Sequence, residues 1–263
     1  MTDSLIYPKV AVGQQLSHCP SVVTLGVCTN LSHYPAWKRE LLFLAPKVYF
    51  PTSLFAETIS ATGRRIFPSV ECYRYAGDKI KQTILFQMQG LPVPRTRFYF
   101  GKKQKKNIIS DFSYPFIAKT PRNSSMGKGV QLINNDRDLE QYLECSQPAY
   151  IQDYLPGCRD FRVIMAGNCI VHAYERVPGQ GEFRANVALG GSIVLGKVPE
   201  KVLQLARRTA GLCSFSYTGL DICVYQDHCY LLEANMKFGL EGFHQAGLDL
   251  QKILRSLIAR DVI

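Results

Sequence analysis

Several familiar signatures are missing from this 263-residue sequence. None of its nine cysteines stands in a Cys-X-X-Cys pair, so the sequence indicates neither a zinc site nor a disulfide framework. Neither Gly-X-Gly-X-X-Gly nor Gly-X-X-X-X-Gly-Lys-Ser/Thr occurs, which removes the usual evidence for Rossmann and P-loop nucleotide sites. Met1–Gly13 does not resemble a signal peptide, and the longest apolar segment, Leu41–Pro46, is too short to cross a bilayer. We therefore expect a cytoplasmic protein with reduced thiols and no membrane partner.

The bulk composition is that of a folded globular protein. Hydrophobic residues make up 46% of the chain and charged residues 20%, which argues against disorder. The length allows a sizeable core and two or three compact lobes. The net charge of +10 favours an anionic partner, whether a nucleotide, an acidic peptide or a nucleic acid, although a solvated basic surface gives the same charge.

The stretch from residue 217 to residue 242 has the pattern of a β-hairpin. Two runs rich in β-branched and aromatic residues, Thr218–Tyr225 and Cys229–Ala234, flank a short polar segment. A turn centred on Asp227 puts Asp221 and Glu233 directly opposite each other, because they lie equally far from it in sequence. Their Cβ atoms are then expected about 5 Å apart.

Facing carboxylates on such strands predict a metal site. Because side chains alternate along a strand, Asp221 is expected to share a face with Cys223, and Glu233 to share a face with Leu231 and Asn235. Two carboxylates on buried strands repel and lose hydration unless a cation joins them. Their oxygens, with the Asn235 amide, suit Mg²⁺ or Mn²⁺ completed by phosphates and water. The alternative is an exposed sheet face with ordinary polar residues.

The N-terminal part predicts a small α/β lobe. Residues 1–20 have no strong periodicity and are expected to form a loose lead-in. Val22–Val27 is a strand candidate, Pro35–Ala45 a helix candidate and Lys47–Phe50 a second strand candidate. This alternation is typical of an α/β lobe, here cut short before it forms a full nucleotide-binding unit.

Apolar periodicity and turn residues predict the remaining elements. Helices are expected from Lys79 to a stop at Gly90, and over Asp136–Cys145, Pro199–Cys213 and Leu248–Arg260. Strands are expected over Thr96–Phe100, Pro115–Lys119, Val130–Ile133, Ala149–Leu155, Val163–Ala166 and Cys169–Val177.

Basic residues mark two places before the centre of the chain. Asp78 is expected to cap the helix that Lys79 begins, and taken alone Lys79 is a surface lysine. Lys102–Lys106 is expected to be a basic loop, either a solvated turn or a docking patch for an acidic substrate.

A lysine and a glycine-rich loop together suggest phosphate binding. Lys119 ends a predicted strand that runs into the small and glycine residues of Arg122–Gly129. Such a loop leaves backbone N–H groups free to fold over a phosphate chain, with Lys119 placed to neutralise it. Arg162, Arg176 and Arg184 follow on strands or their ends, and their planar forks suit carboxylates and phosphates, although surface arginines remain the alternative.

Taken together, these residues resemble the ATP-grasp superfamily, and within it the RimK-type ligases that add glutamate to ribosomal protein or to small carboxylates. The likeness covers roughly Asp78 to Arg260. It is carried by GDKIKQTILFQMQGLPVPRT, FIAKTPRNSSMGKGV, YIQDYLPGCRDFRVIMAGNCIVHAYER, EFRANVALGG and GLDICVYQDHCYLLEANMKFGLEG.

The resemblance implies an α/β (α+β) ATP-grasp fold in which two α+β subdomains grip ATP, preceded by a short truncated α/β lobe. The lobe is expected over residues 1–75 and the ATP-grasp domain over 76–263. Within that domain the lid subdomain is expected at about 108–155 and the metal-binding subdomain at about 156–263.

The resemblance also implies roles for the matched residues. The implied ATP site consists of Lys79, Lys119, Ser124, Ser125, Met126, Gly127, Gly129, Gln152, Asp153, Tyr154, Asp160, Arg184 and Asn186. The implied metal site for one or two Mg²⁺ or Mn²⁺ ions consists of Asp221, Glu233 and Asn235, and catalytic roles are implied for Arg162, Arg184 and Asn186. In this scheme the two lysines contact the phosphates, the loop from Ser124 to Gly129 is a mobile lid, and Asp153 and Tyr154 line the adenine pocket.

The implied activity is an ADP-forming ligase that activates a carboxylate as an acyl phosphate and joins it to an amino acid such as glutamate. The acid is a peptide, a protein tail or a small molecule. The alternatives are a ligase that makes peptide bonds between small molecules in a biosynthetic pathway and a non-catalytic protein that binds nucleotide or nucleic acid. We expect no nucleic-acid partner, and homo-oligomerisation stays open.

One departure from the family pattern is Met236–Gly239, where the family usually has a small residue followed by Ser-Pro-Gly.

Overall fold

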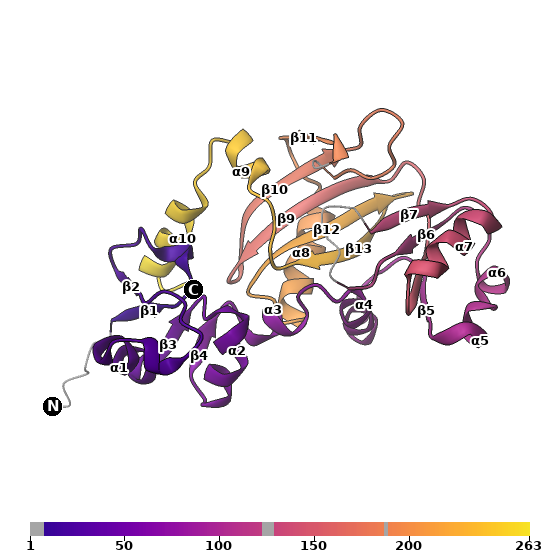
Figure 1. The fold of residues 1–263 in the computed structure, drawn as a ribbon. Coiled ribbons are helices and arrows are strands. Elements are labelled where there is room, and N and C mark those ends of the chain that lie inside the picture. The colour runs from indigo at the N-terminus through magenta and orange to yellow at the C-terminus, as the bar shows by residue number, and fades with distance from the viewer. Residues whose placement is uncertain (1–7, 123–128, 187–188) are drawn as a thin grey trace.

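The computed structural model describes residues 8–122, 129–186 and 189–263. Three β-sheets follow one another across the molecule (Figure 1): a four-stranded sheet near the N-terminus, a five-stranded sheet in the middle and a second four-stranded sheet at the other end. This mixed α/β architecture confirms the predicted fold class. Within the described ranges, none of the helices combines the length and the apolar character that a bilayer span needs.

The N-terminal lobe is a parallel sheet in the order β2-β1-β3-β4. Its strands are β1 (Lys9–Ala11), β2 (Val22–Thr24), β3 (Lys47–Tyr49) and β4 (Arg65–Phe67), and its helices are α1 (Ala36–Leu44) and α2 (Thr52–Ala61), with 3₁₀ turns η1 (Gln14–Leu16) and η2 (Leu31–His33). Val10 and Val48 pack with Phe55 of α2 on one face, while Ala11 and Tyr49 belong to a separate core on the other. A parallel sheet needs cover on both faces, and alternation along β1 and β3 supplies apolar side chains to each.

The expected loose lead-in over residues 1–20 is wrong from Lys9 onward, where β1 begins. β1 lies inside the sheet between β2 and β3, and both Val10 and Ala11 are 0% exposed. A three-residue strand buried on both faces shows a short apolar run rather than an alternating pattern, so periodicity could not reveal it. The helix expected at Pro35–Ala45 and the strand at Lys47–Phe50 are confirmed, and the strand that starts at Val22 ends at Thr24.

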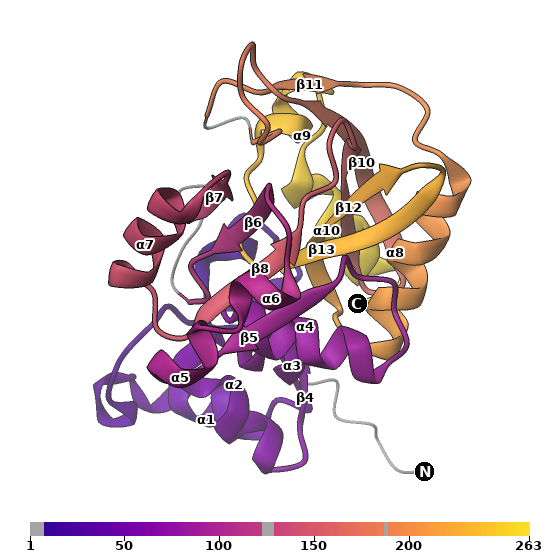
Figure 2. The same cartoon turned by 90° about the vertical axis from the view of Figure 1, so that its right-hand side faces the viewer.

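The second four-stranded sheet is antiparallel, in the order β5-β8-β6-β7. Its strands are β5 (Thr96–Tyr99), β6 (Phe116–Lys119), β7 (Val130–Ile133) and β8 (Ala149–Asp153), and its helices are α5 (Gly101–Lys105), α6 (Ile108–Asp111) and α7 (Asp136–Cys145). Figure 2 shows this sheet with its helices and, beside it, the strands of the five-stranded sheet. Along β6, Phe116 and Ala118 join the core under α6 and α7, whereas Ile117 and Lys119 line a cavity on the inner face.

The basic segment Lys102–Lys106 is not a loop, as its composition suggested, because most of it forms α5. The side-chain oxygen of Gln104 accepts a hydrogen bond from the Phe100 N–H at 2.6 Å, and the Lys105 ammonium donates to the Ser146 carbonyl at 2.8 Å. These contacts stabilise the short helix. Because it has no apolar stripe, its apolar residues show no helical periodicity that could have predicted it.

The five-stranded sheet is antiparallel, in the order β11-β10-β9-β12-β13. Its strands are β9 (Arg159–Ala166), β10 (Cys169–Val177), β11 (Ser192–Val194), β12 (Tyr217–Tyr225) and β13 (His228–Asn235), with helices α3 (Val70–Arg74), α4 (Lys79–Met88) and α8 (Glu200–Leu212) nearby. Phe161 and Val163 of β9 pack with Leu205 of α8 in the largest apolar cluster. Asp160 and Arg162 alternate with them and line the cavity on the opposite face, so this sheet has one apolar and one polar side.

The chain returns to the N-terminal lobe at its end. After α9 (Glu241–Gln245), α10 (Leu250–Ala259) lies against the lobe (Figure 1), where Leu254 and Leu257 share a core with Tyr49 and Phe67. The Tyr49 hydroxyl donates to the Ile263 carbonyl at 3.1 Å. The division into residues 1–75 and 76–263 stays a prediction, and α10 packs across that boundary.

Candidate active site

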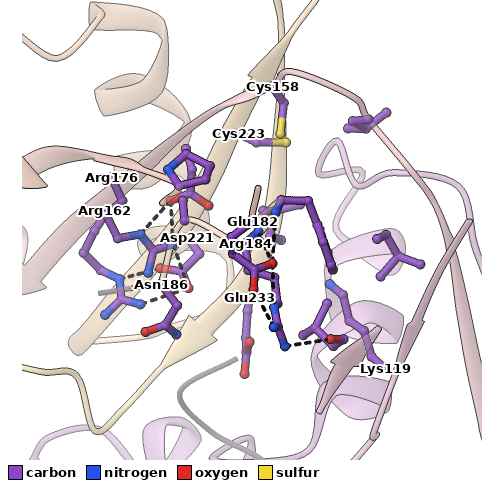
Figure 3. A pocket seen from close by; sticks show the side chains of 18 of the residues that line it. Lys119, Cys158, Arg162, Arg176, Glu182, Arg184, Asn186, Asp221, Cys223 and Glu233 are labelled. Atoms are coloured by element: carbon purple, nitrogen blue, oxygen red, sulfur yellow. Dashed lines mark hydrogen bonds and ion pairs between the residues drawn. The ribbon is translucent and has the colours of Figure 1, made fainter. Parts of the chain in front are cut away.

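A cavity of about 970 Å³ lies between the polar face of the five-stranded sheet and the inner face of the β5–β8 sheet. Strands β9, β10, β12 and β13 supply one side, β6, β7 and β8 supply the other, and the segment from Pro178 to Asn186 forms a third wall. Figure 3 shows charged side chains from these elements converging on it. A concave site of this size, with charged groups among apolar walls, suits a small-molecule ligand.

The predicted hairpin is present, and Asp221 does lie opposite Glu233. The turn itself is shorter than expected: Tyr225 pairs with His228, so only two residues form it, both with positive φ. A β-bulge at Leu232 then adds one residue to β13, because Ile222 pairs with Leu231 while Asp221 pairs with Glu233. The shorter turn and the extra residue cancel, which restores the expected pairing.

The same bulge overturns one detail of the prediction. Leu231 does not share a face with Glu233, because Leu231 is buried in the apolar core. Leu232 and Glu233 both line the cavity instead. The additional residue breaks the strict alternation of side chains at this point of β13.

Two arginines hold the Asp221 carboxylate. Arg162, its partner across β9 and β12, donates through Nε and Nη2 to the two carboxylate oxygens, and the Nη2–Oδ2 distance is 3.0 Å. Arg176 Nη2 lies 3.3 Å from Oδ2, and the Asn235 amide donates to Oδ2 at 3.1 Å. Burial raises the pKa of Asp221, but the two guanidinium groups outweigh it and hold that pKa below its usual range. Asp221 is therefore ionised at neutral pH.

Asp160 shares Arg176 with Asp221. Arg176 Nε donates to Asp160 Oδ1 at 2.6 Å, and Nη2 lies 2.5 Å from the same oxygen. Burial raises the pKa of Asp160, and the nearby Asp221 charge raises it further, while Arg176 opposes both effects. Arg176 thus links two carboxylates from adjacent strands into one buried cluster.

Two lysines approach Glu233. Asp78 caps α4 as expected by accepting a backbone hydrogen bond, which positions Lys79 in the first turn. Lys79 is 5% exposed, and its Nζ lies 3.2 Å from Glu233 Oε1, so it is not a surface lysine. Lys119 is also buried and lies over the Tyr150 ring at 5.5 Å. Burial lowers the pKa of Lys119, while the Glu233 charge raises it.

The segment from Pro178 to Asn186 brings a third basic group. Arg184 binds Glu182 through a 2.6 Å Nη2–Oε2 contact and donates to the Val130 carbonyl of β7 at 3.2 Å. The hydrogen bond from Arg184 lowers the pKa of Glu182 to about 2. Arg184 therefore connects this wall with the β5–β8 sheet, and an anionic ligand would compete with Glu182 for it.

The connection between the two sheets lines the cavity near β8. The buried Gln152 amide donates to Thr96 Oγ1 at 2.8 Å. Asp153 is paired with Arg95, and the Tyr154 ring meets the Phe183 ring edge-on with centroids 6.1 Å apart. This combination of a flat aromatic surface and amide groups suits a planar heterocycle.

The structure brings the predicted site residues together. The described members of the predicted ATP site, metal site and catalytic set all line this cavity: Lys79, Lys119, Gly129, Gln152, Asp153, Tyr154, Asp160, Arg162, Arg184, Asn186, Asp221, Glu233 and Asn235. Ser124, Ser125, Met126 and Gly127 lie outside the described residues. The role of each residue stays a prediction.

Some lining residues escaped the sequence reasoning. Ile117 stands two positions before Lys119 on β6, so strand alternation alone places it on the same face. Phe183 and Glu182 directly precede Arg184 in a segment for which the resemblance implies roles only for Arg184 and Asn186. Leu232 faces the cavity because of the bulge, which the sequence did not signal.

A half-buried histidine on β10, next to Tyr174 of the cavity wall, makes stability depend on pH. His172 Nε2 donates to the Gly242 carbonyl at 2.9 Å, and its ring packs against Tyr174 and Phe243. Burial lowers the pKa of His172, with the Gly242 carbonyl opposing. The unfolded chain therefore binds the proton first, so stability is complete above about pH 6.5 and falls as the pH drops toward the folded-state pKa.

We expect His172→Gln to reduce the loss of unfolding free energy between about pH 7.5 and about pH 5.5, measured by urea denaturation. His18→Gln is the matched control, because His18 is exposed in the N-terminal lobe. An unchanged pH slope in His172→Gln would show that another group causes the acid sensitivity.

Comparison with known proteins agrees with this geometry. A family model described as the RimK-like ATP-grasp domain matches residues 76–258. A probable alpha-L-glutamate ligase of Parasynechococcus marenigrum is 27% identical over 227 residues, which make up 81% of this chain and 48% of the relative. The chain thus spans about half the length of that relative.

Two solved structures establish the ATP-grasp fold. A RimK-domain ATP-grasp protein of Sphaerobacter thermophilus has a TM-score of 0.69 at 14% identity, covering 94% of this chain and 98% of the other. The ATP-grasp ligase PsnB, solved with a phosphomimetic variant of its minimal precursor, Mg and ADP, has a TM-score of 0.68 at 18% identity, covering 97% and 98%. The predicted ATP-grasp fold is therefore confirmed.

Proposed function

Because this chain belongs to the RimK-like ATP-grasp family, we propose that it is a ligase that uses ATP and Mg²⁺ to join a carboxylate to an amine. The carboxylate attacks the terminal phosphate of ATP to give an acyl phosphate and ADP. An amino acid such as glutamate then attacks the acyl carbon, and phosphate leaves. The name of the relative, a probable alpha-L-glutamate ligase, supports the choice of glutamate.

The observation that carries this proposal is the meeting of basic and acidic groups from separate elements. Lys79, Lys119 and Arg184 come from α4, β6 and the third wall, and all three line the cavity around Glu233. Phosphoryl transfer asks little of a protein beyond alignment of the reacting groups and neutralisation of charge on the phosphate oxygens. Cations that the fold already places at the cavity can neutralise that charge with little reorganisation.

The chemistry of Asp221, Glu233 and Asn235 fits magnesium. Together they bring two carboxylates and an amide from paired strands to one cavity. In the described part of the chain, no group of three or more His, Cys, Asp or Glu side chains could hold a metal. Mg²⁺ does not need such a cage, because it takes one or two carboxylates and completes its octahedron with phosphate oxygens and water. When bound, the ion would supply positive charge to the phosphate chain.

The remaining work falls to the side chains themselves. Lys79 and Lys119 would hold the phosphate chain, and Arg184 would exchange Glu182 for a phosphate oxygen. Arg162 and Asn186 would hold the acyl phosphate near the reacting carbon. Because Arg162 and Lys79 already bind Asp221 and Glu233, the acidic cluster can fold before any ligand arrives.

The segment that departs from the family pattern lines the part of the cavity in which we place the substrates. Lys237, Phe238 and Glu241 line it beside Tyr174. The Phe238 ring packs 5.1 Å from that of Tyr217. A lysine and a glutamate at this opening suit the carboxylate and the ammonium group of an amino acid. The acid partner is a peptide, a protein tail or a small molecule, and PsnB, solved with a precursor peptide, gives a precedent for the first.

The test is product analysis. The protein is incubated with ATP, Mg²⁺, an amino-acid mixture and pools of peptides or small acids, and the nucleotides and new masses are followed. We expect one ADP and one phosphate for each new amide, with no product when Mg²⁺ is chelated. AMP and pyrophosphate would contradict the acyl-phosphate route. ATP binding without ADP or product in any pool would favour a non-catalytic nucleotide-binding protein.

A further inference from the structure

Two thiols meet in the cavity, and the proposed ligase chemistry uses neither of them. The side chains of Cys158 and Cys223 point toward each other, and their sulfur atoms lie next to each other (Figure 3). Both residues line the cavity together with Asp160. We propose that this pair is a modification site at which a hydroperoxide forms a disulfide that impedes nucleotide binding. The consequence for nucleotide rests on the proposed function, whereas the disulfide itself does not.

The strand register puts the two cysteines on one face. Cys223 on β12 pairs with Asp160 on β9, and Cys158 stands two positions before Asp160. They are therefore diagonal neighbours across adjacent strands, a relation that leaves Cα atoms about 7–8 Å apart in regular strands. Disulfides usually need a Cα separation below about 7 Å, so one backbone must shift slightly.

Cys158 is the residue free to make that shift. It precedes β9 and lies in a turn, where its N–H donates to the Leu155 carbonyl at 3.3 Å, directly after Gly157 with φ of +69°. Cys223 is fixed within β12, between β9 and β13. A small movement of the turn toward β12 closes the distance without disturbing the sheet.

Exposure sets the order of the reaction. Cys158 is half-buried, whereas Cys223 is 0% exposed, so the peroxide reaches Cys158 first. The neighbouring Cys223 thiol lowers the pKa of the Cys158 thiol, and burial opposes this effect. The Cys158 thiolate attacks one peroxide oxygen, the O–O bond breaks, and a sulfenic acid forms with an alcohol or water as the leaving product. The Cys223 thiol then attacks that sulfur, the S–S bond forms, and the hydroxyl leaves with the thiol proton as water.

The position of the turn explains the effect on nucleotide. Residues 154–158 connect β8 of one sheet with β9 of the other, and Tyr154, Leu155 and Gly157 line the cavity with Cys158. A disulfide links this connection covalently to β12 and moves the residues of the connection that line the cavity toward that strand. When only a fraction of the protein molecules can adopt the arrangement that binds nucleotide, the measured affinity falls in proportion to that fraction. By the same linkage, bound nucleotide protects the thiols.

The first experiment looks for the bond itself. Reduced protein is treated with a small excess of hydrogen peroxide, blocked with iodoacetamide and digested without reductant for mass spectrometry. We expect a linked peptide that contains Cys158 and Cys223 and that dithiothreitol separates. Cys158→Ser and Cys158→Ala should lack it, while Cys145→Ser, which removes an exposed cysteine, should keep it. Full alkylation of Cys158 and Cys223 under conditions that oxidise Cys145 would overturn the proposal, as would a link from Cys158 to any other cysteine.

The second experiment measures ADP–Mg²⁺ binding by calorimetry before and after peroxide. We expect affinity about tenfold weaker in the oxidised protein, recovery with dithiothreitol, and no peroxide effect in Cys158→Ser. A linked protein that binds ADP as tightly as the reduced one would overturn the effect on nucleotide. Failure of the reduced protein to bind ADP would instead count against the proposed function, and the linked peptide would still decide whether the modification site exists.

Discussion

Replacing Asp221 with asparagine is expected to lower ligase turnover about 10³-fold and the free energy of unfolding by about 3 kcal/mol. The Asp221 carboxylate is 8% exposed and neutralises Arg162 and Arg176, which have little solvent to compensate them. Asparagine keeps the size and one acceptor but leaves those guanidinium groups underneutralised, and it removes a ligand from the proposed magnesium site. ADP release and urea denaturation measure the two losses.

Two further variants separate chemistry from folding. Asp227→Asn changes another aspartate, at the exposed tip of the same hairpin, where it pairs with Lys201, and should leave turnover and stability unchanged. Glu233→Gln alters a carboxylate that is less buried than that of Asp221, and the glutamine carbonyl can still accept a hydrogen bond from Lys79. This variant should therefore lower turnover with little loss of stability. Undiminished ATP turnover in Asp221→Asn would remove the basis for the site assignment.

Lys119→Met is expected to weaken ATP–Mg²⁺ binding about 100-fold while leaving the free energy of unfolding unchanged or higher. In the described part of the chain the Lys119 ammonium forms no ion pair, and burial lowers its pKa, which means that the folded protein opposes its charge. Methionine fills the same space without that cost, and Glu233 keeps its contact with Lys79. The loss of nucleotide affinity should therefore occur without a loss of stability.

Calorimetric titration with ATP–Mg²⁺ and thermal denaturation provide the two readings. Lys103→Met is the control, because Lys103 is exposed on α5. Equal nucleotide affinity in Lys119→Met and wild type would contradict a phosphate-binding role. A large loss of stability would show instead that Lys119 supports the fold.

The sequence predicted the part of the site that depends on strand alternation. The hairpin pattern groups Asp221, Glu233 and Asn235, and in the structure all three line one cavity. The pairing of Asp221 with Glu233 nevertheless arose from two compensating departures, a two-residue turn and the bulge at Leu232. A bulge depends on packing against neighbouring strands, so a single sequence has no local signal for it.

Helices and strands whose apolar residues do not recur at a regular spacing could not be predicted from the sequence. β1 is short and buried on both faces, so its residues look like any brief apolar run. α5 is held by the Gln104 and Lys105 contacts rather than by an apolar stripe. The sequence marks Arg176 only as one of three arginines that suit anions. Its contact with both Asp160 and Asp221 depends on the order of β10, β9 and β12, which the sequence does not reveal.

The packing of α10 against the first sheet has a consequence for protein engineering. Leu254, Leu257 and Ile258 complete a core whose other half comes from β1, β3 and β4, at the opposite end of the sequence. An exchange of this lobe between related proteins must therefore transfer the first sheet and α10 together. A chimera joined only near residue 75 would combine a foreign sheet with a helix whose apolar side chains evolved for another surface.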